Sequence, residues 1–180
     1  YNLLAHEPER ATGIGVDTGD YAGWRGQLSD VTPDGLAKYA ASLESDLQAA
    51  RDYPKDGLTG DQLTGFDVVE SAYSTALEGF ALPYGNVAVG SWRNTPYSVV
   101  QNVGSYLDMP RFMDSGHPLN DANDVEAYTA RMEAFPAQLD GELTRIQEAR
   151  GMGLVPPDFL LDKAIAQMES SIASAAETYA

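Results

Sequence analysis

Apolar residues recur every three or four positions in several stretches of the chain, and this spacing is typical of amphipathic helices. The first clear stretch predicts a helix over about 33–53, because Thr32 can cap its start and Pro33 suits the first helical position. A connector that contains Pro54 and two glycines follows it. The next periodic stretch predicts a second helix that ends near Leu82.

The periodic pattern is lost in the middle of the chain. Over 83–94 the sequence is rich in glycine and valine, which predicts a loop or short extended structure. After Pro96 the apolar spacing returns weakly, but Gly104 and Pro110 should limit any helix to a few turns. We expect a short, irregular helical piece there.

The last third of the chain predicts three further helices. Asn120 or Asp121 can cap the first, Pro136 starts the second, and Pro156 and Pro157 precede the last. The apolar positions expected to face neighbouring helices are Val125, Tyr128, Met132 and Phe135 in the first, Leu139, Leu143 and Ile146 in the second, and Leu161, Ile165, Met168 and Ile172 in the last. Five clear helices and almost no strand predict an all-α fold, an irregular helical bundle with its acidic faces in water.

The amino-acid composition and net charge exclude some classes of binding partner. The chain has 180 residues, the size of one ordinary domain, and 43% of them are apolar, which excludes disorder for most of it. Its 27 acidic and 11 basic residues give a formal net charge of -16, which repels nucleic acid and anionic membrane surfaces. No apolar run reaches the roughly 20 residues that span a bilayer. We therefore expect neither nucleic acid nor a membrane as a partner.

The two ends of the sequence do not resemble the edges of a domain. The chain starts at Tyr1, and the apolar stripe of the last predicted helix continues towards Ala180 without a glycine, asparagine or proline to stop it. We interpret this as a helix that is cut short, and we expect its apolar face to be exposed. A frayed natural terminus is the alternative.

Searches for catalytic and metal-binding patterns find no complete site. There is no cysteine, which excludes thiolate ligands and a cysteine nucleophile. His6 begins a sequence like a zinc-binding helix, but Arg10 stands where the second histidine is needed, so His6 is expected at the surface. His117 lies in a turn sequence with no second histidine near it. We expect no catalytic residue and no metal ligand in this chain.

One segment, residues 90–112, combines amides, arginines and aromatic rings. Such side chains can hold a peptide backbone, pair with carboxylates and offer flat apolar surface. The segment is therefore a candidate wall of a binding cleft. The speculative substrate-binding residues are Trp92, Arg93, Asn94, Tyr97, Gln101, Asn102 and Arg111. The alternative is a structural loop that uses these amides to satisfy its own backbone groups.

Several short runs, in their order along the chain, resemble the bacterial family catalogued as domain of unknown function 885. None of these runs is a catalytic signature, and together they span nearly the whole sequence. The runs are Gly15-Val16-Asp17, Leu28-Ser29-Asp30, residues 92–112, Phe135-Pro136-Ala137-Gln138-Leu139-Asp140, and Val155-Pro156-Pro157 leading into Leu161-Asp162-Lys163.

The resemblance implies a largely helical protein of several hundred residues, often exported, with a zinc-peptidase signature of His-Glu and paired histidines in its later half. Residues 1–180 would then be the N-terminal helical portion of a larger metallopeptidase-like hydrolase. The partner would be the C-terminal catalytic half, which would hold the zinc, and the substrate a peptide. The alternative is a self-contained helical binding or scaffolding module without catalysis.

Overall fold

The computed structural model describes residues 1–91 and 93–178, and over these residues the fold is all-α, as the sequence predicts. Isolated bridges occur among the described residues, but no strand does. No described helix combines the length and apolar character needed to cross a membrane. The helices are α1 (Asn2–His6), α2 (Pro8–Gly13), the 3-10 helix η1 (Gly19–Gly26), α3 (Pro33–Asp52), α4 (Gly60–Phe80), α5 (Ser105–Ser115), α6 (Ala122–Gly151) and α7 (Asp158–Thr178).

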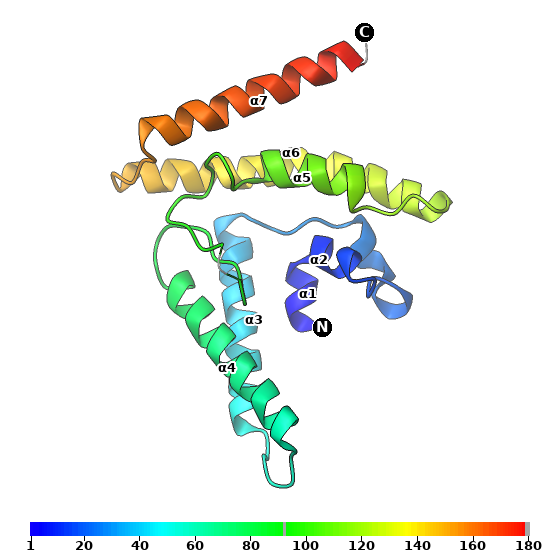
Figure 1. The fold of residues 1–180 in the computed structure, drawn as a ribbon, viewed down its shortest axis with the longest axis vertical. Coiled ribbons are helices and arrows are strands. Elements are labelled where there is room, and N and C mark those ends of the chain that lie inside the picture. Colours follow the sequence, from blue (N-terminus) through cyan, green and yellow to red (C-terminus); the bar gives the residue numbers. More distant parts are fainter. Residues whose placement is uncertain (92, 179–180) are drawn as a thin grey trace.

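Helices α3 and α4 form an antiparallel hairpin, and α6 runs across its open end with α5 alongside (Figure 1). The predicted start of α3 is confirmed, because the Thr32 hydroxyl accepts a hydrogen bond from the Gly35 N–H at 3.0 Å. Helix α4 begins earlier than its apolar pattern indicates. Thr59 and Gln62 form a reciprocal capping box, which satisfies the first N–H groups of α4.

The apolar core lies between the two helices of the hairpin and the segment that follows them. Tyr39 and Leu43 of α3 pack with Ala76 of α4 and with Val89. Val87 and Val89 point into this core, whereas Gly90 and Ser91 line surface hollows. The segment after α4 is therefore fixed to the hairpin by alternate residues.

Pro136, predicted to start a separate helix, lies inside one long helix instead, whereas the short helix predicted around Pro110 is confirmed as α5, with 11 residues. Pro136 stands within α6, which is one helix of 30 residues and not two. Pro110 likewise lies within α5. A proline in a helix removes one backbone hydrogen bond, so contacts outside the helix must offset that loss. In α6 the side chains of Arg131 and Gln138, on either side of Pro136, both bond to the N-terminal part of the chain.

The prediction of which face of α6 is buried is wrong. The apolar residues expected to pack inward are exposed at five positions, Val125, Met132, Leu139, Leu143 and Ile146. The buried face instead carries polar side chains at intervals of seven, Asp124, Arg131, Gln138 and Arg145. Because seven residues complete two helical turns, these four lie along one stripe. Helix α6 therefore contacts the rest of the molecule through a polar stripe.

Helix α7 lies on the opposite side of α6 from the hairpin (Figure 1). Ala164 is buried, and Gln167 accepts a hydrogen bond from the Tyr106 hydroxyl at 2.7 Å. The expected exposure of its apolar face is confirmed for Ile165 and Ile172, whereas Leu161 and Met168 are partly buried.

The buried apolar face of α3 and the exposed apolar face of α6 should lose different amounts of stability on the same substitution. Leu43→Ala, at a fully buried position of α3, should lower the free energy of unfolding by about 2–5 kcal/mol because it leaves a cavity. Leu143→Ala, at a half-exposed position of α6, should lower it by less than about 1 kcal/mol. Urea unfolding of both variants measures the difference, and similar losses would contradict the assignment of the α6 faces.

Candidate functional site

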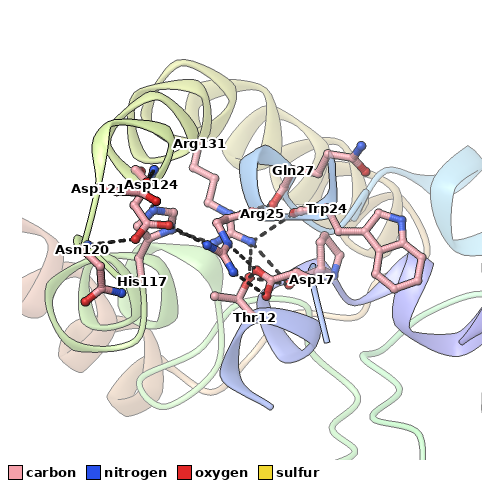
Figure 2. A network of polar contacts seen from close by, with 11 residues as sticks. Thr12, Asp17, Trp24, Arg25, Gln27, His117, Asn120, Asp121, Asp124 and Arg131 are labelled. Atoms are coloured by element: carbon pink, nitrogen blue, oxygen red, sulfur yellow. Dashed lines mark hydrogen bonds and ion pairs between the residues drawn. The ribbon is translucent and has the colours of Figure 1, made fainter. Parts of the chain in front are cut away.

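Six residues from five separate segments form a closed ring of hydrogen bonds, called here the polar ring, in which one bond goes to the backbone oxygen of Asp124 (Figure 2). Arg131 and Asp124 come from α6, Thr12 from α2 and Arg25 from η1. Asp17 precedes η1, and His117 follows α5. The members are Thr12, Asp17, Arg25, His117, Asp124 and Arg131.

Arg131 is the most deeply buried member, with 0% of its surface exposed. Its Nε donates to the Gln27 carbonyl at 2.8 Å, and its Nη2 donates to the Thr12 hydroxyl at 2.8 Å and to the Trp24 carbonyl at 3.2 Å. Its guanidinium carbon lies 4.8 Å from the centroid of the Phe112 ring. Burial lowers the pKa of Arg131, and the charges of Glu9 and Asp17 oppose that shift.

His117 is held by both of its ring nitrogens. Nη1 of Arg131 lies 2.8 Å from Nδ1, and the backbone oxygen of Asp124 lies 2.9 Å from Nε2. Because a guanidinium can only donate, Nδ1 accepts, so the proton is on Nε2 and is donated to Asp124. This histidine is therefore a fixed, neutral link between the turn after α5 and the first turns of α6.

Arg25 bridges the two carboxylates of the ring. Its Nε lies 3.1 Å from Oδ2 of Asp17, and its Nη1 lies 2.6 Å from Oδ1 of Asp124. Burial alone would raise the pKa of Asp17, but hydrogen bonds from Arg25 and Thr12 outweigh it, and the pKa is lowered. The hydrogen bond from the Asn120 backbone is the largest cause that lowers the pKa of Asp124, and burial opposes it.

A second polar cluster lies further along the same stripe of α6. The carboxylate of Glu9 accepts hydrogen bonds from the backbone N–H and the hydroxyl of Ser29, at 3.0 and 2.5 Å. Nε2 of Gln138 donates to the Ser29 carbonyl at 3.0 Å. Further on, Glu142 accepts from the N–H and the hydroxyl of Ser105 and so caps α5. These contacts join α6 to the N-terminal segments and to α5.

The polar ring can hold segments together, but it offers no group for a reaction. Its members are bonded to one another, and Asp17, Asp124 and Arg131 are almost completely buried. No group of three His, Cys, Asp or Glu side chains in the described part of the chain could hold a metal ion. His6, expected at the surface, is half-buried and stacks on the Tyr39 ring at 4.9 Å between centroids.

The segment proposed from the sequence, residues 90–112, runs from a loop into α5, and its first part lies in a loop that is closed by its own hydrogen bonds. Asn86 and Thr95 pair through their backbones at 2.7 and 3.2 Å. Within this loop Oδ1 of Asn94 accepts from the Ala88 N–H at 2.9 Å, and Nδ2 donates to the Ser91 carbonyl. Asn94 therefore holds the loop in shape, which is what the structural alternative predicts.

The other predicted residues of the segment are spread over a longer path. Arg93 is exposed, and its Nη2 donates to the Asn102 carbonyl at 3.5 Å. Tyr97 and Gln101 are half-buried, and Oε1 of Gln101 is buried without a hydrogen-bond partner among the described residues. Arg111 is exposed on α5. Trp92 lies outside the described residues.

Residues 88–91 and 93–94 stand between two open hollows. A hollow of about 650 Å³ lies on one side, where Asn94 faces a stretch of α4 that includes Asp67 and Ser71. A hollow of about 590 Å³ lies on the other side, where Arg93 and Asp108 face Arg10 of α2. Ala88, Gly90 and Ser91 line both hollows. Arg93 and Asn94, which are adjacent in the sequence, thus line different hollows, and Arg111 lines neither.

The comparisons with known proteins give a family but no activity. A family model described as "Bacterial protein of unknown function (DUF885)" matches residues 8–180. A search of curated proteins found no match, and neither did a search of solved structures.

The polar ring predicts that the shape of Arg131 matters as much as its charge. Arg131→Lys should lower the free energy of unfolding by at least about 3 kcal/mol, because one ammonium leaves several buried acceptors without a partner. Arg150→Lys, at an exposed position of α6, is the matched control and should change it by less than about 0.5 kcal/mol. Equal losses in chemical denaturation would show that the hydrogen bonds of Arg131 do not support the fold.

The lowered pKa of Asp17 predicts a loss of stability in acid. Below the ordinary value of 3.8 the unfolded chain binds a proton at this carboxyl before the folded chain does, so stability falls as pH falls towards the folded pKa. Asp17→Asn removes this contribution. The unfolding free energies of the two proteins should therefore differ most near pH 7 and converge as pH is lowered from about 4 to 2. A difference that stays constant over this range would contradict the prediction.

Proposed function

Because the chain belongs to the DUF885 family of bacterial proteins, we propose that it is the N-terminal helical portion of a zinc-dependent, peptidase-like hydrolase. In this proposal residues 88–91 and 93–94 form part of the wall of the substrate cleft. The observation that carries it is the position of this segment between two open hollows, with Ala88, Gly90 and Ser91 on the surface of both.

The chemistry of the wall suits an extended peptide. Its small side chains allow a substrate backbone to approach closely, and the side chain of Arg93, an exposed residue that also donates to the Asn102 carbonyl, can pair with a peptide carbonyl or carboxylate. The wall is also rigid. Val89 is buried in the core, and the side chain of Asn94 ties the loop to itself at two points. A loop that is already fixed in this way loses little conformational entropy when a substrate binds.

The described residues do not suit the metal that such a hydrolase requires, since they form no group that could hold it. In this proposal the zinc ligands belong to another part of the protein, where the metal would activate a water for attack on the peptide carbonyl. We assign to this chain only contacts with the substrate, and no step of the reaction.

A second function is favoured by one observation, the exposed apolar stripe of α6. Val125, Met132, Leu139 and Ile146 follow one another at intervals of seven and are all exposed. Such a stripe is typical of a helix that packs against a partner. The chain could therefore be a helical binding or scaffolding module without catalysis.

Kinetics of the full-length protein separate the two functions. With zinc bound it should hydrolyse peptides, and Arg93→Ala should raise KM about tenfold through the loss of one charge-assisted hydrogen bond, with the melting temperature unchanged. Arg150→Ala removes an exposed arginine from α6 and is the control that should leave KM unchanged. Absence of zinc-dependent hydrolysis, or an unchanged KM for Arg93→Ala, would reject the cleft wall.

A further inference from the structure

A pocket of about 250 Å³ lies where the hairpin, the loop after α4 and α6 meet. Leu36 and Ala40 of α3, Phe80 of α4 and Val87 give it an apolar wall. Arg145 and Glu148 of α6 complete the lining with one positive and one negative side chain. The volume lies just below the range of roughly 300–1,000 Å³ for drug-sized ligands, so a smaller molecule fits it.

Arg145 is a buried residue, with only 8% of its surface exposed. Its Nη2 donates to the Gly85 carbonyl and to Oδ1 of Asn86, at 3.1 Å in the second case. Gly85 has a positive φ of 93°, and a side chain there would meet the Thr95 carbonyl oxygen at 2.8 Å. Glycine at position 85 therefore allows the loop conformation in which the Gly85 carbonyl oxygen accepts a hydrogen bond from Arg145.

Two of the three nitrogens of this guanidinium, Nε and Nη1, donate to no acceptor among the described residues. No carboxylate among these residues lies within ion-pair distance of Arg145 either. Glu142 is three residues away, but it is buried and bonded to Ser105, and burial raises its pKa. Burial lowers the pKa of Arg145, and the charges of Glu142 and Glu148 oppose that shift only in part. An anionic group in the pocket that Arg145 lines could accept hydrogen bonds from the two remaining nitrogens.

Charge also limits what the whole ligand can be. The chain carries a formal net charge of -16, which repels anions at long range. Glu148 at the same pocket adds a local negative charge. A ligand with both a carboxylate and an ammonium has no net charge, and it can place the first at Arg145 and the second at Glu148.

We propose that this pocket binds a free α-amino acid with an apolar side chain, with its carboxylate at Nε and Nη1 of Arg145 and its ammonium at Glu148. The side chain lies against Leu36, Phe80 and Val87. This site is not the cleft wall of residues 88–91 and 93–94, and the inference does not depend on hydrolysis. The chemical class follows from three features of one pocket, namely its size, its apolar wall and its two opposite charges.

Calorimetric titration of the full-length protein with leucine tests the proposal, with chelator present so that no bound metal contributes. Leucine should bind with one-to-one stoichiometry. Leucinamide lacks the carboxylate and N-acetylleucine lacks the ammonium, so each should bind at least about tenfold more weakly. Glu148→Gln should weaken leucine binding and leave that of N-acetylleucine unchanged.

A blocking variant tests the location without removing a buried charge. Ala37 is exposed on α3 and lines the pocket, so Ala37→Phe should fill its opening and weaken leucine binding at least about tenfold. Ala41→Phe places the same ring at an exposed position of α3 that does not line the pocket, and it should bind leucine as the unmodified protein does.

Three results would overturn the proposal. They are no saturable binding of leucine, equal binding to Ala37→Phe and Ala41→Phe, and binding of N-acetylleucine at least as tight as that of leucine. The last result would assign the pocket to simple carboxylates, including peptide C-termini. Peptide hydrolysis is measured separately, and none of these three binding results decides whether it occurs. Failure of the amino-acid site and failure of the cleft wall are therefore distinguishable.

Discussion

The fold depends on the burial of one arginine. The guanidinium of Arg131 is completely enclosed, and no carboxylate among the described residues forms an ion pair with it. Its burial is tolerated because its N–H groups donate hydrogen bonds to four acceptors. These are the carbonyls of Trp24 and Gln27, the Thr12 hydroxyl and the His117 ring. Those acceptors come from segments that are irregular or short. Arg131 therefore fixes residues 8–27 to α6, in a part of the molecule that lies outside the apolar core.

The sequence predicted the parts of the fold that follow from local rules. Thr32 and Pro33 mark the start of α3, and Asp121 caps α6 by accepting from the Asp124 N–H at 3.0 Å. Both signals involve residues a few positions apart, so the sequence alone contains them. Pro136 was misjudged because its cost is also local, whereas the contacts that offset it connect α6 to residues more than a hundred positions away.

The buried face of α6 could not be recognised from apolar spacing. The rule that apolar residues face inward selects Val125, Met132 and Leu139, and the structure buries Asp124, Arg131 and Gln138 instead. A polar residue at every seventh position was visible, but nothing in the sequence shows which distant groups would satisfy it. The runs that carry the family resemblance contain Asp17, Ser29 and Gln138, and all three are polar partners in these contacts. The candidate site stays a prediction, since Arg93 and Asn94 line two different hollows.

The polar ring also sets an order in which the chain can gain its stability. The α3–α4 hairpin is closed by a short connector, so its contacts are local and inexpensive in chain entropy. The bond from Arg25 to Asp124 spans 99 positions, and that from Arg131 to Pro8 spans 123. Each of these bonds stabilises the protein only after a loop of that length has closed, and the ring is satisfied only when all its segments are present. The segments that carry Thr12, Asp17 and Arg25 therefore gain these bonds only after α6 has been synthesised and has docked, whereas α1 can already contact α3. This makes the hairpin the first unit able to fold as the chain is made.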